Sequence, residues 1–374
     1  MRYRLPMSSN AKSPVTKSGL IVVTGAAGLI GSAVAWALNR RGQENLLLVD
    51  TLDSSEKWKH LPPLRFADYM QADDFLAKLE TAPAHFGNVH AVYHLGACSA
   101  TTERDAAYLI RNNFEYTKAM CAWALSRRSR FVYASSAATY GDGAHGMDDK
   151  SDDLARLRPL NMYGYSKHLF DLHAQRAGFL RHIIGLKYFN VFGPNEDHKG
   201  DMRSVVAKAY EQILATGRLS LFKSHRPDFA HGMQRRDFLY VKDAVDITLH
   251  LADKPLAGGL YNVGSGEART WLDLAHAVFA ALGRDPQIDF VDMPDALRGK
   301  YQYHTCADIT KLRSTGYTRS VTPLNEAVRD YVVNYLVPGR FLAFKGPRED
   351  GIPAGRPVSV AARRNRSGLR IRSF

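Results

Sequence analysis

Tyr163 and Lys167 are the pair of residues in this sequence best placed for acid–base chemistry. They stand four apart in the run 163–167, Tyr-Gly-Tyr-Ser-Lys, and side chains at that spacing share one face of a helix. A lysine ammonium beside a phenol favours the phenolate, which makes a group with an ordinary pKa of about 10 a usable base near neutral pH. Ser136 ends an earlier apolar run and can hydrogen-bond the same substrate oxygen. The three residues predict a catalytic group centred on a tyrosine base.

A glycine-rich turn follows the first apolar run and predicts a dinucleotide site. Residues 24–31 read Thr-Gly-Ala-Ala-Gly-Leu-Ile-Gly and lead into a helical pattern. Gly25 permits a tight turn, Gly28 lets backbone N–H groups approach a pyrophosphate, and Gly31 lets the helix lie close to the sheet. Asp50 closes the second apolar run at about the 20-residue interval expected of a ribose-binding acid. The position of the turn after the first predicted strand, together with Asp50, makes the dinucleotide site a strong prediction.

The residues leave the choice between NAD and NADP open. Asp50 would hydrogen-bond a ribose 2′-hydroxyl and so favours NAD, whereas Lys57 could supply the cation that a 2′-phosphate needs. A second turn of small residues ends another apolar run and offers a place where the cofactor could lie on the sheet edge. Its residues are Leu95, Gly96, Ala97, Cys98 and Ser99.

Short apolar runs alternate with helical patterns through the first half of the chain. The runs are continuous, which is typical of parallel strands buried on both faces. The pattern predicts an α/β fold with a Rossmann-type doubly wound parallel sheet and a second, smaller α/β domain. The expected strands are 20–24, 46–50, 89–95, 130–136, 182–189, 237–241 and 260–264, and the expected helices are 29–41, 104–127, 163–178, 270–282 and 322–336.

The same pattern divides the chain into domains and tails. The predicted parts are a basic tail (1–18), a dinucleotide-binding domain (19–190, with 237–263 returning to it), a substrate domain (191–236 and 264–337) and a second basic tail that we expect to be disordered (338–374).

The positive charge of the chain is concentrated in those two tails. The 374 residues are 45% hydrophobic and 23% charged, which is typical of a globular protein and excludes a collagen-like or disordered chain. Of the formal net charge of +13, residues 1–18 carry +4 and residues 338–374 carry +7. The folded part is therefore nearly neutral, so nucleic acid is not the expected partner, although weak polyanion binding by the tails stays open.

The cysteines and the apolar runs indicate the compartment. Cys98, Cys121 and Cys306 are odd in number and form no C-x-x-C pair, so neither a disulfide framework nor a metal site is expected. No run approaches the roughly 18 apolar residues of a membrane span, and residues 1–18 lack the apolar core of a signal peptide. We expect a cytoplasmic protein with no membrane partner.

Taken together, these motifs resemble the extended short-chain dehydrogenase/reductases. Within that superfamily the sequence is similar to the ADP-L-glycero-D-manno-heptose 6-epimerase family, over roughly residues 19–337. The runs that carry the closer similarity are LGACSATTE (95–103), NNFEY (112–116), YASSAATYG (133–141), LNMYGYSKHLFD (160–171), KYFNVFGPNEDHKGDM (187–202), RRDFLYV (235–241) and GKYQ (299–302).

This resemblance implies an isomerase that inverts C6″ of ADP-D-glycero-D-manno-heptose and so supplies heptose for the lipopolysaccharide core. A tightly held NADP would take hydride from the substrate and return it to the opposite face, without net redox change. Proton transfer must then be served from two sides of the site, and Lys199 matches the second base of the family. The resemblance also implies a ring-shaped homo-oligomer.

Further contacts follow from the resemblance alone. Besides the glycines, the cofactor would meet Leu29, Ile30, Asp50, Thr51, Lys57, Leu95, Gly96, Ala97, Cys98, Ser99, Asn112 and Lys167. The ADP-heptose substrate would meet Asn190, Val191, Asp201, Lys208, Phe222, Lys223, Ser224, His225, Arg236 and Tyr301. A guanidinium fork suits a diphosphate, and a phenol combines ring stacking with a polar tip.

Other functions compete with this interpretation. A 4-epimerase of the UDP-galactose type would share Tyr163 and Lys167 but would not need Lys199. A nucleotide-sugar dehydratase would carry an acidic pair after Ser136, where residues 137–138 are both alanine. A redox-silent NADP-binding scaffold could lose the catalytic residues that this chain retains.

Overall fold

A computed structural model describes residues 19–150, 152–255, 257–299 and 301–343. The predicted basic tail at 1–18, and the predicted tail at 338–374 from residue 344 onward, lie outside the described residues. Among the described helices, none combines the length and the apolar character needed to cross a membrane.

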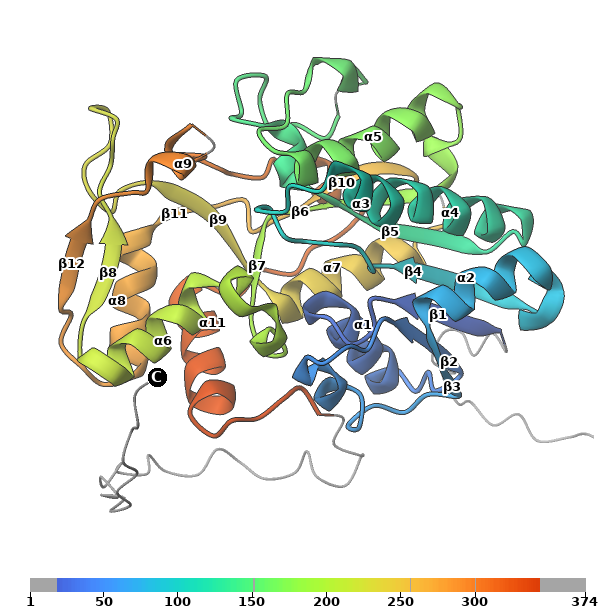
Figure 1. Ribbon diagram of the computed structural model, residues 1–374, viewed down its shortest axis with the longest axis horizontal. Coiled ribbons are helices and arrows are strands. Elements are labelled where there is room, and N and C mark those ends of the chain that lie inside the picture. Colours follow the sequence, from blue (N-terminus) through green and yellow to red (C-terminus); the bar gives the residue numbers. More distant parts are fainter. Residues whose placement is uncertain (1–18, 151, 256, 300, 344–374) are drawn as a thin grey trace, which may run out of the picture. The chain divides into compact units, whose positions relative to one another are not determined.

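Helices and strands alternate along the described chain (Figure 1). The strands are β1 (Leu20–Thr24), β2 (Leu46–Asp50), β3 (Asp68–Gln71), β4 (Val89–His94), β5 (Arg130–Ser136), β6 (Ile184–Tyr188), β7 (Asn190–Phe192), β8 (Leu219–Phe222), β9 (Arg235–Tyr240), β10 (Gly259–Val263), β11 (Ala268–Thr270) and β12 (Ile288–Val291). The α-helices are α1 (Leu29–Arg40), α2 (Ala72–Thr81), α3 (Ala106–Leu109), α4 (Tyr116–Ser126), α5 (Met162–Arg176), α6 (Val205–Thr216), α7 (Val241–Asp253), α8 (Trp271–Ala281), α9 (Asp295–Arg298), α10 (Thr310–Ser314) and α11 (Leu324–Tyr331).

The largest element is a seven-stranded parallel sheet in the order β10-β6-β5-β4-β1-β2-β3. The order reverses at β1, which lies between β2 and β4, so the carboxyl ends of these strands form a topological switch point. This confirms the predicted Rossmann-type fold. The predicted helix at 104–127 is α3, a π-helical turn at Ile110–Glu115 and α4 in succession.

Side chains of the sheet alternate between two apolar cores. Ile21 and Val23 of β1 face one core, which includes buried residues of α1 and α7. Val22 faces the other, with Phe75 of α2 and Trp123 of α4. Because successive strand residues point to opposite faces, both faces are covered by helices, which is why these strands read as continuous apolar runs.

The second part of the fold follows β6. It contains a three-stranded sheet, β11-β9-β7, and a parallel pair, β12-β8, with α6, α8 and α11 packed beside them. Of the segment 237–263, predicted to return to the dinucleotide-binding domain, α7 and β10 do so, since β10 pairs with β6. Most of the segment's first strand, β9, instead pairs with β7 and β11, so the return begins at residue 241.

The folded chain extends further than the predicted boundary at residue 338. Leu342 is only 1% exposed and packs in the core beside α1. Its backbone N–H donates to Oδ1 of the buried Asn195 at 3.0 Å, and the indole of Trp36 donates to the carbonyl of Ala343 at 3.0 Å. Residues 338–343 therefore belong to the folded unit.

Two truncations test this boundary. A chain ending at Val337 should be less stable than a chain ending at Ala343 by about 2–4 kcal/mol, because it loses a buried leucine and the bond to Asn195. Thermal unfolding of the two proteins measures the difference. Equal melting temperatures would show that 338–343 contributes nothing to the fold.

Candidate functional site

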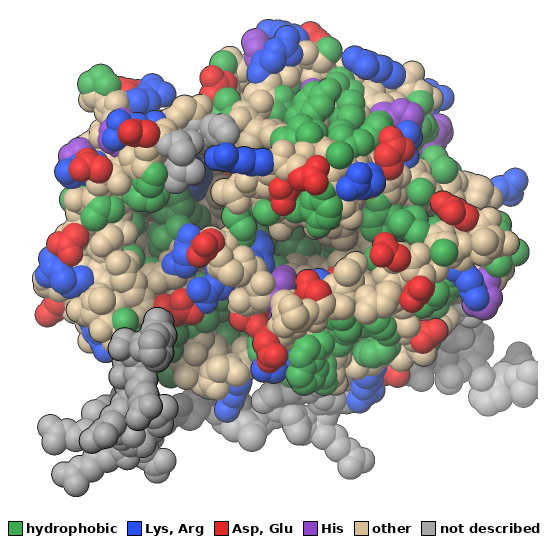
Figure 2. Space-filling view, viewed as in Figure 1, with side chains coloured by type: hydrophobic (Ala, Val, Ile, Leu, Met, Phe, Trp, Pro, Cys, Tyr) green, Lys and Arg blue, Asp and Glu red, His purple; other side chains and the backbone are tan. Residues whose placement is uncertain are grey.

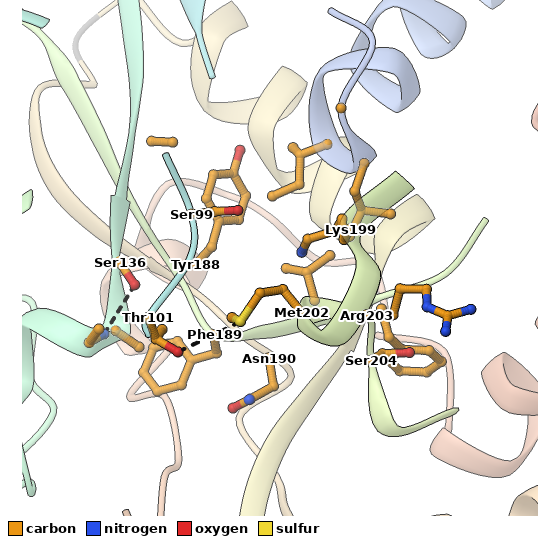
Figure 3. A pocket seen from close by; sticks show the side chains of 18 of the residues that line it. Ser99, Thr101, Ser136, Tyr188, Phe189, Asn190, Lys199, Met202, Arg203 and Ser204 are labelled. Carbon is orange, nitrogen blue, oxygen red and sulfur yellow. Dashed lines mark hydrogen bonds between the residues drawn. The ribbon is translucent and has the colours of Figure 1, made fainter. Parts of the chain in front are cut away.

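A cleft of about 490 Å³ lies where the carboxyl ends of the parallel strands meet the second part of the fold. Figure 2 shows this region hollowed, and Figure 3 shows side chains that line it. Its walls come from the glycine-rich turn, the ends of β4 and β5, the start of α5, and the segments around β7 and residues 198–206. The carboxyl edge at a switch point is where open α/β sheets bind their ligands.

The glycine-rich turn forms one end of the cleft. Gly25, Gly28 and Gly31 all line it, as do Leu29 and Ile30. Gly25 has φ +67°, and a Cβ there would lie 2.6 Å from the backbone nitrogen of Gly96. A Cβ on Gly31 would lie 2.0 Å from the carbonyl oxygen of Gly25. The turn therefore requires glycine at both positions, and it directs the N-terminus of α1 into the cleft, where a pyrophosphate would be stabilised.

Asp50 and Lys57 stand together beside this turn. Oδ2 of Asp50 accepts from the N–H of Ala27 at 2.7 Å, and Oδ1 accepts from the N–H of Thr51 at 2.8 Å. The ammonium of Lys57 pairs with Oδ1 at 2.9 Å. Asp50 and Lys57 line the cleft, so the structure brings together the two residues that favour different cofactors.

The second turn of small residues forms the floor of the cleft through Leu95, Gly96, Ala97 and Ser99. The backbone of Cys98 instead bonds to the side chain of Asn113. Oδ1 of Asn113 accepts from the N–H of Cys98 at 2.9 Å, and its amide donates to the Cys98 carbonyl and to Ser166.

Three predicted cofactor contacts fall outside the lining. Among the residues the structure describes, Thr51, Cys98 and Asn112 are not part of the cleft wall. The side chain of Asn112 donates to the carbonyl of Tyr108 one helical turn earlier. The buried Asn113 beside it holds the turn in place, and a repeated Asn-Asn at 112–113 gave no sequence signal to separate the two.

Helix α5 brings Tyr163 to the end of β5. Asn161 caps the helix, with Oδ1 accepting from the N–H of Gly164 at 2.8 Å. A Cβ on Gly164 would lie 2.7 Å from the carbonyl oxygen of Ala138, so only glycine lets the helix approach the turn that follows Ser136. Ser136, Tyr163 and Lys167 all line the cleft. The structure thus brings the three predicted catalytic residues together.

Burial controls the acid–base properties of this group. It raises the pKa of Tyr163, and hydrogen bonding to Ser136 opposes that rise. Burial also lowers the pKa of Lys167 to about 8, although the negative charge of Asp171 acts to raise it. The ammonium of Lys167 donates to the carbonyl of Ala134 at 2.9 Å. The spacing of Tyr163 and Lys167 predicted a lowered pKa for the tyrosine. The pKa of Tyr163 is instead raised in the polypeptide alone, because desolvation of the phenol dominates.

Lys199 lies on the opposite wall of the cleft. It belongs to the short turn Asp197–Met202, and its side chain points into the cavity in Figure 3. Burial lowers the pKa of Lys199, while the charge of Glu196 opposes the shift. Glu196 is buried and accepts from the N–H and the hydroxyl of Ser204, each at 2.6 Å. This anchors the turn to the start of α6.

The predicted substrate contacts divide into two groups. Asn190 and Val191, on β7, line the cleft. Arg236 lies just behind, with its guanidinium 4.9 Å from the ring centre of Tyr301 and 5.6 Å from that of Trp271, which itself lines the cleft. The other predicted contacts are not found on the wall within the described ranges: Asp201 and Lys208 are exposed, and Phe222, Lys223, Ser224 and His225 continue outward from β8.

A buried ion pair supports the catalytic wall from behind. Asp171, on α5, lies 3.2 Å from the ammonium of Lys187 on β6, and both side chains are almost fully buried. The carboxylate also accepts from the hydroxyls of Tyr133 and Ser135 of β5 at 2.8 Å each. Asp171 thereby fixes α5 against β5 and β6. The sequence alone did not single out either member of this pair.

Removing Asp171 should destabilise the protein strongly. Asp171→Ala leaves the Lys187 charge buried and unpaired, which costs about 3–5 kcal/mol. Ser135→Ala removes one hydrogen bond and keeps the ion pair, so we expect about 1 kcal/mol. Denaturant unfolding of both variants measures the two losses, and equal losses would contradict the importance given to the pair.

Comparison with known proteins places the chain in a family. A model of the NAD dependent epimerase/dehydratase family matches residues 21–264. An ADP-L-glycero-D-manno-heptose-6-epimerase of Nitratidesulfovibrio vulgaris is 51% identical over 317 residues, covering 85% of this chain and 98% of that protein.

Solved structures agree with the fold. The ADP-L-glycero-D-manno-heptose-6-epimerase of Helicobacter pylori matches with a TM-score of 0.71 at 23% identity, covering 84% of this chain and 96% of the other. A UDP-glucose 4-epimerase of Thermus thermophilus, in complex with NAD, matches with a TM-score of 0.67 at 25% identity, covering 84% and 98%. The chain therefore belongs to the NAD dependent epimerase/dehydratase family, and within it to the ADP-L-glycero-D-manno-heptose-6-epimerases.

Proposed function

We propose that this protein inverts C6″ of ADP-D-glycero-D-manno-heptose, to give ADP-L-glycero-D-manno-heptose, by transient oxidation and re-reduction. The observation that carries the proposal is that two possible bases, Tyr163 and Lys199, line one cleft from different elements, α5 and the turn Asp197–Met202. Inversion through a carbonyl needs proton transfer on both faces. The relative from Nitratidesulfovibrio vulgaris carries this activity in its name.

The first face is served by the group at the end of β5. Ser136 would hydrogen-bond the substrate oxygen, and Tyr163 would take its proton. Lys167 is buried, and its ammonium would add positive charge that favours the phenolate. A nicotinamide dinucleotide, when bound, supplies the hydride acceptor and donor.

The opposite face is served by Lys199. Because burial lowers its pKa, the amine gives up a proton more easily than an exposed lysine and is suited to proton exchange with the substrate. Arg236, whose guanidinium lies close to the rings of Tyr301 and Trp271, would bind the diphosphate.

For the cofactor we propose NADP. Lys57 lies beside Asp50 at the edge of the cleft and could pair with a 2′-phosphate in place of the carboxylate. Both oxygens of Asp50 already accept hydrogen bonds from the backbone, so this acid is less available to a ribose 2′-hydroxyl.

The second candidate is a 4-epimerase of the UDP-galactose type. The Thermus thermophilus protein is named as a UDP-glucose 4-epimerase and shares the fold. Tyr163 and Lys167 would serve both reactions. Lys199 on the facing wall favours the heptose reaction, since a 4-epimerase has no need of it.

A direct assay separates the two candidates. The purified full chain is incubated with ADP-D-glycero-D-manno-heptose and, in parallel, with UDP-galactose, and the product stereoisomers are resolved. We expect conversion of the heptose only, and NADP as the nucleotide released on denaturation. Conversion of UDP-galactose alone would establish the 4-epimerase, and a protein that neither holds nor takes up a nicotinamide would exclude both.

Substitution of the two bases tests their assignment. Tyr163→Phe and Lys199→Met should each lower the rate of epimerisation by about 10²- to 10⁴-fold, while the protein keeps its nucleotide. Tyr165→Phe is the control for the first, because Tyr165 lies on the same helix and is 45% exposed. An unchanged rate in either variant would remove that residue from the mechanism.

A further inference from the structure

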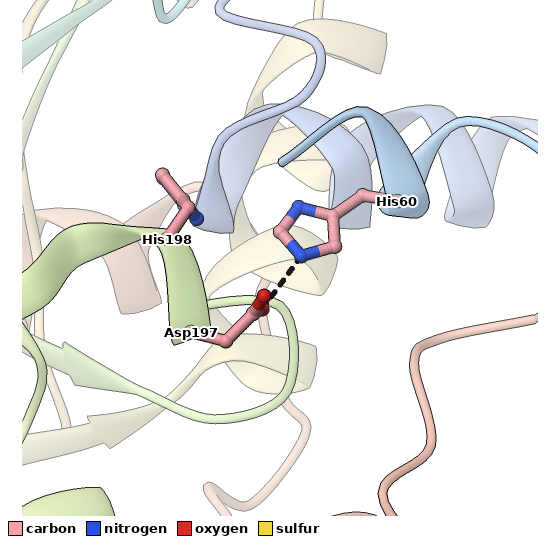
Figure 4. A group of neighbouring side chains, drawn as sticks. All are labelled: His60, Asp197 and His198. Atoms are coloured by element: carbon pink, nitrogen blue, oxygen red, sulfur yellow. Dashed lines mark hydrogen bonds and ion pairs between the residues drawn. The ribbon is translucent and has the colours of Figure 1, made fainter. Parts of the chain in front are cut away.

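His60 joins the two walls of the cleft through both of its ring nitrogens. Figure 4 shows its contact with Asp197. His60 ends the short helical turn Glu56–His60, and its side chain is fully buried. Nδ1 lies 2.7 Å from the carbonyl oxygen of Ala27, in the glycine-rich turn. Nε2 lies 2.7 Å from Oδ1 of Asp197, two residues before Lys199. These contacts connect segments that are far apart in the sequence.

The partners of His60 determine where its hydrogens are. A carbonyl oxygen and a carboxylate are both acceptors, so each ring nitrogen must donate. Burial acts to raise the pKa of Asp197, but the hydrogen bond and the charge of His60 outweigh it, and the pKa lies below its ordinary value. The carboxylate is therefore ionised near neutral pH, and His60 in this arrangement is an imidazolium.

The groups around His60 fit this assignment. The ring of His198 approaches edge-on at 5.3 Å and that of Phe341 at 5.1 Å. Burial, followed by the charge of His60, lowers the pKa of His198 to about 4, so His198 is neutral. The remaining charged groups nearby are the ammonium groups of Lys57 and Lys199 and the carboxylate of Asp197. Asp197 is the anion that bonds to His60.

Both partners of His60, Ala27 and Asp197, lie in segments that carry predicted functional residues. Ala27 donates its N–H to Asp50 and accepts from His60 with its carbonyl, so its two flanking peptide groups are held from both sides. The backbone N–H of Lys199 donates to the carbonyl of Glu196, in the same turn as Asp197. Moving Asp197 away from His60 would therefore move Lys199 relative to the dinucleotide site.

We propose that His60 is a positioning residue. In its doubly protonated form it holds the turn of Lys199 against the glycine-rich turn, through hydrogen bonds to Asp197 and Ala27. This inference rests on the proposed function, because it acts through Lys199.

A divalent metal ion is the competing occupant of these atoms. His60, Asp197 and His198 place possible ligand atoms within 4.8 Å of one another. Ligand atoms around a tetrahedral ion with bonds of about 2.0–2.1 Å lie roughly 3.3 Å apart. The separation of 2.7 Å between Nε2 and Oδ1 matches a charge-assisted hydrogen bond instead.

Asp197→Asn and Asp197→Ala form a matched pair for the test. The amide of Asn can donate to Nε2 of a neutral His60. Asp197→Asn therefore keeps a hydrogen bond between residues 60 and 197 without a second proton on His60. Asp197→Ala removes this hydrogen bond. We expect Asp197→Ala to lower kcat about tenfold with little change in KM and with the nucleotide retained. Asp197→Asn should stay within about twofold of the parent.

Lys199→Met separates this proposal from the proposed function. In the Lys199→Met background, Asp197→Ala should have no further effect, because His60 acts through Lys199. If Lys199→Met alone is fully active, the second base is wrong, and that failure is seen without any variant at 60 or 197. If Asp197→Ala matches the parent at every pH, the positioning role of His60 is wrong.

Nitrogen NMR of histidine-labelled full chain gives a readout independent of activity. The His60 signals, assigned from a His60→Asn variant, should show both nitrogens protonated in the parent and only Nδ1 protonated in Asp197→Asn. A neutral His60 in the parent near neutral pH would overturn the proposal. Stoichiometric zinc that shifts the His60 and His198 signals together would also overturn it, in favour of a metal site.

Discussion

The close approach of two backbone turns is the constraint on which the rest of the site depends. Gly25 and Gly96 lie against each other with no side chain between them, and a Cβ on either residue would come within 3 Å of the other's backbone. Thr24 reinforces the contact, since its hydroxyl accepts from the N–H of Gly96 at 3.1 Å and bonds to Nδ1 of His94 at 2.9 Å. Burial and the charge of Lys167 lower the pKa of His94 to about 3, so the imidazole is neutral and Nδ1 can accept. At this point the cleft floor is backbone without intervening side chains, and a dinucleotide can lie on it.

The two walls of the cleft are positioned by buried charge. Behind the first wall, Asp171 and Lys187 hold α5 against the sheet and so fix Tyr163 and Lys167. At the second wall, Glu196 anchors the turn of Lys199 to α6. Buried ion pairs and carboxylates are weak evidence for stability as such. Here each buried charge lies directly behind a residue proposed to move a proton. We infer that their role is to position those residues.

The sequence was sufficient for the fold and for the parts of the site that follow strand ends. Gly25 follows a recognisable apolar run and Ser136 ends one, and the carboxyl edge of a parallel sheet brings such residues together. Tyr163 could be placed by its helical spacing to Lys167. Residues that act from the interior could not be placed in the same way. Asp171 and Lys187 are 16 residues apart, and each looks like an ordinary charged residue until the sheet is assembled. His60 and Asp197 are 137 residues apart.

The contacts implied by resemblance that do not line the cleft have a physical explanation too. Asn112 and Asn113 are adjacent, and which of them faces inward depends on the π-helical turn that interrupts the predicted helix. Phe222 to His225 continue from a two-stranded edge pair whose direction depends on β12, a strand that no sequence signal revealed. Arg236 could be expected near a diphosphate from its chemistry, but its approach to the rings of Tyr301 and Trp271 depends on tertiary packing.

The central claim is that hydrogen removed from the substrate is stored on a nucleotide and returned to the same molecule. The direct measurement uses ADP-D-glycero-D-manno-heptose carrying deuterium at C6″, converted by the full chain in ordinary water and analysed by mass spectrometry. The account predicts that the product keeps its deuterium. Exchange of the label for solvent hydrogen would contradict it, because a carbon-bound hydrogen that leaves as a proton implies inversion by deprotonation, without hydride transfer.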